Sequence, residues 1–146
     1  MEIPAPSCDY AHRQDIQMRF ADADLFGHVN NAVIMQYFDQ GKLGYFRAVM
    51  GDDFDMRGIA LVVVNTNCNF YAPVFLDEQV AVLSGTAHIG EKSLRLEQRL
   101  VSSTGDVKAI CTTVMVGFDP ATSTSAPIAP LWRERLEISQ KAARKD

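Results

Sequence analysis

Hydrophobic and polar positions alternate in several separate stretches of the chain, and each such stretch predicts a strand with one buried face. The first is Asp15–Phe20, in which Ile16, Met18 and Phe20 alternate with polar neighbours. Four longer runs later in the chain have the alternation or the β-branched composition of strands. These runs are Ile59–Tyr71, Glu78–Ile89, Ser93–Ser102 and Val107–Phe118.

One long helix is expected between the first strand and the others, over Asn30–Met50. Asparagine side chains stand at its start, where they are good N-caps, and Gly51 stands just past its end, where helices commonly stop. Apolar residues cover more than one narrow face of this helix, which indicates that it is substantially buried. Gly41 inside it lowers helix stability by roughly 1 kcal/mol relative to Ala.

This order of elements predicts an α+β fold with an antiparallel sheet, because strands and helices do not alternate. A curved sheet wrapped around the single helix is the most economical arrangement. The sheet edges would stay exposed, and pairing of two protomers edge to edge would cover them, so at least a dimer is expected. The other segments are expected to be a loose arm, a linker and a short surface helix, at 1–13, Thr122–Pro130 and Trp132–Lys145.

The composition is that of one ordinary globular domain covering residues 1–146. Hydrophobic residues make up 47% of the chain and charged residues 22%, close to the averages for such domains. The net charge of -4 argues against a nucleic-acid partner, which needs a basic surface. No secretory signal is visible, and no apolar run reaches the roughly 18 residues of a membrane span. A cytoplasmic protein without a membrane partner is therefore expected.

The cysteines and histidines do not suggest a metal site. Cys8, Cys68 and Cys111 have neither metal-ligand spacing nor an even number for a set of disulfides, and free thiols in a reducing cytosol are the simplest interpretation. The histidines add no ligand spacing either. The chain also lacks a Gly-x-Ser-x-Gly nucleophile elbow, which argues against a Ser-His-Asp hydrolase.

The segment Arg19–Asn31 reads RFADADLFGHVNN and joins the first strand to the long helix. It resembles the Asp-x-Asp-x-x-Gly-His-Val-Asn-Asn signature of the 4-hydroxybenzoyl-CoA thioesterase family, whose enzymes have the hot-dog fold. Weaker agreements extend the resemblance over roughly residues 15–135. They are Tyr37-Phe38-Asp39, Ile89-Gly90-Glu91-Lys92-Ser93, Phe118-Asp119 and Pro127-Ile128-Ala129-Pro130.

The resemblance implies an acyl-CoA thioesterase, which hydrolyses a thioester to a free acid and coenzyme A. Asp24 matches the carboxylate that acts in the family as general base or nucleophile. The backbone N–H of Asn31 matches the donor that polarises the thioester carbonyl, with Asn30 nearby as a substrate contact. Gly27 lets the backbone come close, and His28 is a candidate for polarising the carbonyl or orienting water.

Other interpretations of these residues stay open. Asp24 could be a solvated loop carboxylate or an anion favoured by the helix dipole. Asp22 is interpreted as a hydrogen-bonding structural partner in the loop. Asp39 is either a second candidate carboxylate or an exposed helical residue, and the second is favoured. His12 and His88 are interpreted as structural or exposed.

Coenzyme A would need cations or free N–H groups for its phosphates. By resemblance, Lys92 and Ser93 lie in the turn near this ligand. Arg95 and Arg99 could extend a small basic strip, although Glu97 between them suggests a solvated face with ion pairs. Polar residues that alternate on one face of the strand expected at Ile59–Tyr71 meet either the ligand or a facing protomer; these are Asn65, Asn67 and Asn69.

No cofactor is expected, since coenzyme A is part of the substrate, and the assembly would be a homodimer or homotetramer. Two alternatives remain: a thioesterase for acyl carrier protein, and a non-catalytic hot-dog protein that binds acyl-CoA. The helix departs from the family at Ala32–Met35 and Asp39–Lys42, so the sequence leaves the acyl group undefined.

Overall fold

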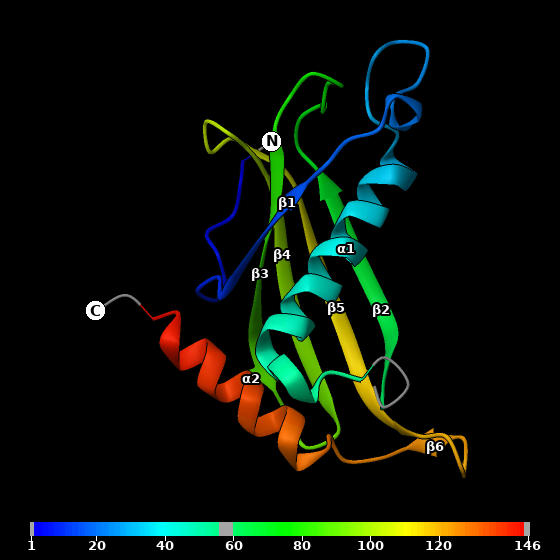
Figure 1. The fold of residues 1–146 in the computed structure, drawn as a ribbon, viewed down its shortest axis with the longest axis vertical. Helices are drawn as coiled ribbons and strands as arrows, with labels where there is room; N and C mark the ends of the chain where they lie inside the picture. Colours follow the sequence, from blue (N-terminus) through cyan, green and yellow to red (C-terminus); the bar gives the residue numbers. More distant parts are fainter. Residues whose placement is uncertain (1, 56–59, 145–146) are drawn as a thin grey trace.

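A long helix, α1, lies against one face of a curved antiparallel sheet in the computed structural model, which describes residues 2–55 and 60–144 (Figure 1). The strand order is β1-β3-β4-β5-β2, and the short strand β6 pairs with β5. The helices are α1 (Asn31–Met50) and α2 (Pro130–Ala142). The strands are β1 (His12–Ile16), β2 (Leu61–Phe70), β3 (Val80–Ile89), β4 (Ser93–Ser102), β5 (Val107–Asp119) and β6 (Thr124–Ser125).

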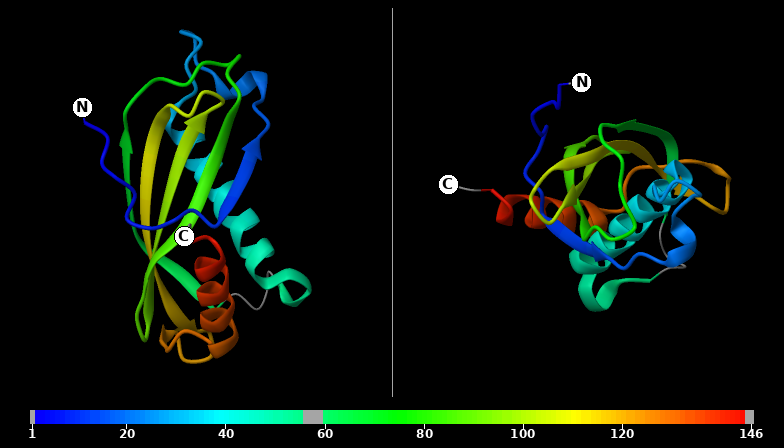
Figure 2. Two further views of the ribbon diagram at one scale, coloured as in Figure 1. Left: turned by 90° about the vertical axis from the view of Figure 1, so that its left-hand side faces the viewer. Right: turned by 90° about the horizontal axis from the view of Figure 1, so that it is seen from above.

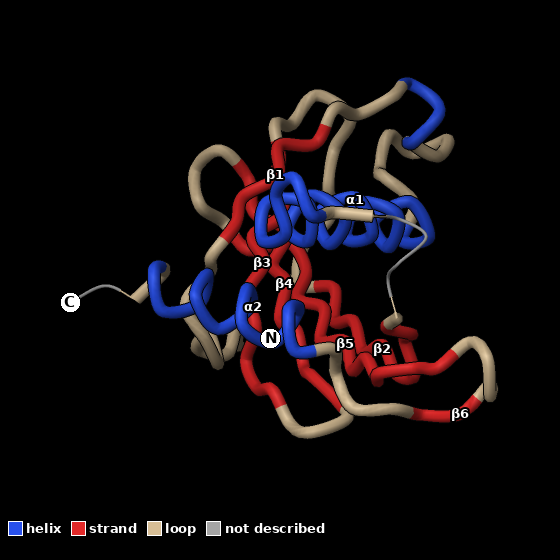
Figure 3. Tube along the Cα trace, turned by 60° about the horizontal axis from the view of Figure 1, so that its bottom comes forward, coloured by secondary structure: helices blue, strands red, loops and turns tan. Residues whose placement is uncertain are grey.

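The sheet curls around α1, as the view from above shows (Figure 2). Seen from below, α1 forms a separate layer over the strands (Figure 3). Apolar side chains fill the space between the layers in two clusters, one around Tyr37 and Phe38 and one around Tyr45 and Phe46. The α+β hot-dog arrangement expected from the sequence is therefore confirmed.

Helix α1 packs very closely on β3 at Gly41. A Cβ atom at this position would lie 2.7 Å from Val82 Cβ and closer still to Val82 Cγ1. Only glycine therefore fits between the helix and the sheet here, and the loss of helix propensity is compensated by close packing.

The first strand lies earlier in the chain than predicted. It covers His12–Ile16 rather than Asp15–Phe20, and it pairs with β3 so that Ile16 is opposite Val80. The chain leaves the sheet after Ile16, and Phe20 lies in a 3-10 turn with 89% of its surface exposed. Apolar and polar residues still alternate after Ile16, but no strand of the sheet pairs with the chain there. The alternation therefore predicted a strand that lies too late in the sequence.

The prediction of a loose N-terminal arm was wrong for Pro4–Tyr10. This segment lies along the sheet face that α1 does not cover (Figure 2). Glu97 on β4 accepts hydrogen bonds from Ser7 Oγ at 2.9 Å and Tyr10 Oη at 2.6 Å, and Arg99 donates to the Pro4 carbonyl.

The solvated face expected on β4 is therefore largely covered. Glu97 and Arg99 are buried, and their charged groups lie 3.9 Å apart, whereas Arg95 is exposed. The basic strip predicted for Arg95 and Arg99 is absent, because the N-terminal segment occupies the surface around Arg99.

The C-terminal helix, α2, lies on the surface as predicted, with one face buried. It begins at Pro130, and Trp132 and Leu136 are buried. The Trp132 ring packs edge-on against Phe46 of α1, with 5.1 Å between ring centroids. The predicted end at Lys145 lies outside the described residues.

Three of the later strands agree closely with the sequence. The bounds of β4 are those predicted, β5 ends one residue later at Asp119, and β3 begins two residues later at Val80. Strand β2 covers Leu61–Phe70, and the predicted start at Ile59 lies outside the described residues. No helix in the described part of the chain is long and apolar enough to span a membrane.

Candidate active site

Asp24 opens a tight turn that holds its carboxylate in place. One carboxylate oxygen, Oδ1, accepts hydrogen bonds from the backbone N–H of Phe26 at 2.9 Å and of His28 at 3.2 Å. The Asp24 N–H donates to the His28 carbonyl at 2.8 Å. Gly27 closes the turn with φ of 78°, a backbone conformation that other residues adopt at a cost. The sequence Asp-x-x-Gly-His thus fixes the orientation of the carboxylate.

The N-terminus of α1 follows directly. Asn30 is the N-cap, and its Oδ1 accepts from the Ala32 N–H at 2.8 Å. The Asn30 carbonyl accepts from the N–H groups of Val33 and Ile34. Asn31 is the first helical residue, so its N–H is one of the donors for which a helix has no acceptor of its own. The positive end of the helix dipole adds to the attraction for a negative oxygen.

The carboxylate and the helix N-terminus face the same cavity. It has a volume of about 310 Å³. Its lining consists of Asp24, His28, Val29, Asn30, Asn31, Ile34, Ala72, Pro73 and Val74. A carboxylate and the backbone of the first helical residue therefore line the same cavity as the apolar side chains of Ile34, Pro73 and Val74.

A second cavity, of about 620 Å³, is also lined by Asp24. Gly27 lines it together with Phe20, Leu25 and Leu76. The structure thus brings five of the sequence-predicted site residues together around one turn. They are Asp24, Gly27, His28, Asn30 and Asn31.

Asp22 has a different environment from Asp24. Its side chain is only 2% exposed and accepts hydrogen bonds from the Tyr37 hydroxyl at 2.7 Å and the Arg19 N–H at 3.0 Å. Burial alone would raise the pKa of Asp22, but the hydrogen bonds from Arg19 and Tyr37 outweigh it and lower the pKa. The interpretation of Asp22 as a hydrogen-bonding partner in the loop is confirmed.

Tyr37 was missed as a partner of this loop. Its hydroxyl is buried on α1, fifteen residues from Asp22 along the chain. A buried tyrosine on a helix normally finds an acceptor for its hydroxyl, so the sequence indicated that Tyr37 has a partner. It did not show which residue that partner is. The Asp22 carbonyl also accepts from the Asn30 N–H at 3.2 Å, so the loop is tied to the helix at two points.

His28 packs against Phe75, with ring centroids 4.9 Å apart and planes at 82°. Its ring is therefore held by an apolar contact at the cavity wall. Asp39 lies on the exposed side of α1, with 75% of its side chain accessible, and forms an ion pair with Lys42 at 3.4 Å. It is not among the residues that line the cavity beside Asp24, which favours the interpretation as an exposed helical residue.

Lys92 and Ser93 are not near Asp24 within one protomer. Ser93 pairs with Val116, which in turn pairs with Val62 near the start of β2. The cavity at Asp24 is instead lined by Ala72–Val74, just after the end of β2 at Phe70. The span from Val62 to Phe70 on β2 is roughly 26 Å at about 3.3 Å per residue.

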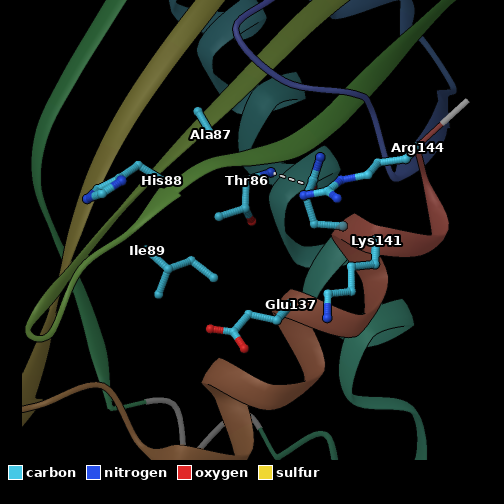
Figure 4. A pocket seen from close by; sticks show the side chains of 8 residues that line it. Thr86, Ala87, His88, Ile89, Glu137, Lys141 and Arg144 are labelled. Carbon is cyan, nitrogen blue, oxygen red and sulfur yellow. Dashed lines mark hydrogen bonds between the residues drawn. The ribbon is translucent and has the colours of Figure 1, made fainter.

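The remaining histidines have separate surroundings. His12 is half-buried on β1 beside Tyr45. His88 lines a surface hollow of about 300 Å³ between β3 and α2, with Glu137, Lys141 and Arg144 from the helix and the segment after it (Figure 4). Gln140 bridges the two elements by accepting from the Thr86 N–H at 3.0 Å. Within residues 2–55 and 60–144, no group of three or more potential metal ligands is found.

The loop around Asp24 carries large apolar side chains that contact solvent. Phe20, Leu25 and Phe26 have between 85% and 102% of their surface exposed, and Phe75 has 40%. Sequence reasoning placed Phe20 in the first strand and the other two in a loop, although three large apolar residues within seven positions were a visible signal. An apolar patch of this kind commonly marks a contact surface.

The chain is similar in sequence to known proteins. A family model described as "Thioesterase-like superfamily" matches residues 18–136. The long-chain acyl-CoA thioesterase FadM of Escherichia coli (strain K12) is 28% identical over 126 residues, which cover 84% of this chain and 94% of FadM. The uncharacterized protein YsmA of Bacillus subtilis (strain 168) is 28% identical over 83 residues, which cover 56% of this chain and about half (54%) of YsmA.

The fold is also similar to solved structures. A thioesterase from Thermus thermophilus, in complex with coenzyme A and Zn, superposes with a TM-score of 0.81 and 28% sequence identity. The superposition covers 91% of this chain and 96% of the Thermus protein. The narrower 4-hydroxybenzoyl-CoA thioesterase family stays a prediction.

Proposed function

The chain belongs to the thioesterase-like superfamily, and from this premise we propose that it hydrolyses an acyl-CoA to a free carboxylic acid and coenzyme A. The enzyme class expected from the sequence, thioester hydrolase, is that of the family. One observation carries the proposal: the Asp24 carboxylate and the first turn of α1 line the same cavity.

Asp24 is the proposed base or nucleophile. Its Oδ1 is occupied by two backbone donors, so Oδ2 is the oxygen that would react. As general base, it takes a proton from a water molecule that attacks the thioester carbonyl carbon. As nucleophile, it attacks that carbon itself, the thiolate of coenzyme A leaves, and water then hydrolyses the mixed anhydride.

The N–H of Asn31 is proposed to receive the carbonyl oxygen of the thioester. Negative charge develops on this oxygen during either route, and a preorganised N–H donor stabilises that charge more than it stabilises the neutral substrate. Ile34 and Val74 on the cavity wall would contact the first carbons of the acyl group. His28, held by Phe75, would stand beside the reacting water.

A homodimer is proposed as the working form. The edge strand β2 has exposed Val62, Val63 and Val64, and the patch around Phe20 and Phe26 is also uncovered in one protomer. Antiparallel pairing of two β2 strands would bring the far end of one protomer, with Lys92 and Ser93, toward the Asp24 cavity of the other. These two residues could then contact coenzyme A, as expected from the sequence.

The test is release of free thiol from short-chain, long-chain and aromatic acyl-CoAs by the wild-type protein and by Asp24→Asn. Asparagine keeps the oxygen that accepts from Phe26 and His28, so the turn should survive. Loss of a base typically lowers the rate by about 10²–10⁴-fold. Long-chain substrates belong in the panel because of the similarity to FadM.

The matched control is Asp39→Asn, which removes an exposed carboxylate from α1 and should leave the rate near that of the wild type. Both variants must keep the oligomeric state of the wild type. An active Asp24→Asn protein would contradict the assigned role. A wild-type protein that binds coenzyme A and hydrolyses nothing in the panel would instead favour a binding protein.

A further inference from the structure

Cys68 and Cys111 lie directly opposite each other on neighbouring strands. They are paired residues in the antiparallel β2–β5 ladder. Directly opposed residues place their side chains on the same face of a sheet. Cys111 is 2% exposed within the cluster around Phe38, and Cys68, half-buried, packs against the same cluster. Both thiols therefore lie on the inner face, under α1.

The backbone spacing suits a disulfide. Opposed residues in an antiparallel pair have Cα atoms about 4.5–5.5 Å apart, and disulfides join Cα atoms about 4.4–6.8 Å apart. The Cα atoms of this opposed pair therefore fall within the range that a disulfide spans. The two thiols are also close enough for each to shift the pKa of the other.

The surroundings favour a thiolate at Cys111. The interaction with the neighbouring Cys68 thiol, with help from the Thr113 hydroxyl and Lys42, outweighs burial and lowers the pKa of Cys111. The interaction with Cys111, together with burial, raises the pKa of Cys68. The Lys42 side chain is 14% exposed, so its positive charge is only partly screened by solvent.

We propose that Cys68 and Cys111 form a redox-active dithiol, which closes to a disulfide when the protein meets a low-molecular-weight disulfide such as oxidised glutathione. The Cys68 thiol, half-buried on the edge strand, passes its proton to the Cys111 thiolate as its sulfur attacks one sulfur of the reagent. The reagent thiolate that leaves then takes this proton from Cys111. The Cys111 thiolate then attacks the Cys68 sulfur of the mixed disulfide, and the second thiol leaves. Two protein thiols and one reagent disulfide thus give one protein disulfide and two reagent thiols.

Cys8 provides a built-in comparison. It lies in the N-terminal segment, beside Gly85 and close to Glu97 on the outer face of the sheet. Burial, together with Glu97, raises the pKa of its thiol to about 11. Cys8 therefore has neither the opposed partner nor the ionised form that the inner pair has.

A disulfide at this position would join the edge strand β2 covalently to β5. The cluster that holds Cys111 also contains Ile34 and Val74, which line the cavity beside Asp24. The redox state of the pair would thus act on the inner wall of the candidate site. The proposal of a dithiol does not depend on the proposed function, because its test measures free thiols and disulfide-linked peptides and not thioester hydrolysis.

The experiment incubates the folded wild-type protein with oxidised glutathione, quenches free thiols with an alkylating reagent, and maps the linked peptides by mass spectrometry without reduction. Cys68→Ser, Cys111→Ser and Cys8→Ser are treated in parallel. The wild type and Cys8→Ser are expected to lose two free thiols and to give a peptide pair linked through Cys68 and Cys111. Dithiothreitol should restore both thiols.

In the Cys111→Ser protein, the reaction should stop at a mixed disulfide between glutathione and Cys68. In the Cys68→Ser protein, Cys111 should stay a free thiol, and because it is buried it should react with the alkylating reagent only after the protein is unfolded. The proposal is overturned if the wild type keeps all its thiols under these conditions. It is also overturned if the linked peptides contain Cys8 or join two chains. Circular dichroism of each treated sample ensures that the thiols are read in folded protein.

Discussion

Two carboxylates stand two residues apart in the loop before α1, and their surroundings give them different uses. Asp22 is buried and accepts hydrogen bonds from Tyr37 and Arg19. Its carboxylate is therefore occupied by the hydrogen bonds that hold the loop. Asp24 is exposed and has one oxygen held by the backbone. The loop therefore combines a fixed anchor with a carboxylate that can react.

At the same scale, His12 should make folding stability sensitive to mild acid. Its Nδ1 is buried without a hydrogen-bond partner, and burial lowers its pKa below the ordinary value of 6.5. The unfolded chain therefore binds a proton more readily than the folded one. The contribution of His12 is complete above pH 6.5 and is lost as the pH falls from there toward the lower pKa of the folded state.

Urea unfolding at about pH 7.5 and about pH 5.5 measures this effect. The wild type should lose more stability over this interval than His12→Gln, which cannot titrate. Equal losses in the two proteins would show that other groups cause the pH dependence.

At the scale of elements, α1 is placed by two close approaches rather than by its caps alone. Gly41 touches Val82 of β3, and Gln98 of β4 donates to the Phe38 carbonyl at 3.0 Å. The helix therefore has little freedom to slide along the sheet. The cavity at its N-terminus depends on that fixed position.

Gly41→Ala should destabilise the protein although alanine is the better helix former. The gain in propensity is about 1 kcal/mol, whereas overpacking of this kind costs about 1–3 kcal/mol. Denaturant unfolding compares it with Gly44→Ala, whose Cβ would meet chiefly the flexible end of the Gln14 side chain. A Gly41→Ala protein at least as stable as Gly44→Ala would contradict the packing argument.

The N-terminal segment should also stabilise the sheet. Tyr10→Phe removes a donor from the buried carboxylate of Glu97, and leaving such a group with one partner fewer costs about 1–3 kcal/mol. Asp9→Asn, at an exposed position of the same segment, should change stability by less than about 0.5 kcal/mol. Equal unfolding midpoints for the two variants would show that the segment does not stabilise the sheet.

The sequence was informative wherever signals are local. The caps at Asn30 and Gly51 placed α1 within one residue, and alternation in Ser93–Ser102 predicted the bounds of β4. The N-terminal segment was misjudged because its partners are far along the chain, as Tyr10 and Glu97 are. For the site, a motif predicted the turn and the helix start, while the walls at Ala72–Val74 depend on how β2 ends.

At the scale of the whole molecule, two uncovered apolar surfaces stand out, one on the β2 edge and one in the loop before α1. Strand β2 has a neighbour on one side only, and the exposed Phe20, Leu25 and Phe26 adjoin the candidate site. A long unpaired edge strand with apolar side chains tends to pair with another chain. These features support the proposed dimer and connect it to the site.

Val63→Lys should therefore weaken self-association. Val63 is 46% exposed on β2, and lysine on an edge strand opposes strand pairing. Light scattering after size-exclusion chromatography should find a dimer for the wild type and a smaller species for Val63→Lys. Leu131→Lys is the matched control, since Leu131 is 42% exposed on α2, and it should stay dimeric. A monomeric wild type would rule out the proposed dimer.

The turn at Asp24 and the first residue of α1 belong to one short continuous stretch, whereas the cavity walls come in part from the segment after β2. In the proposed mechanism, reactivity and selectivity are therefore encoded in different parts of the sequence. Substitutions at Ala72 or Val74 could redirect the enzyme to another acyl group while the reacting atoms stay where they are. Divergence within such a lineage would then conserve the reaction and exchange the substrate.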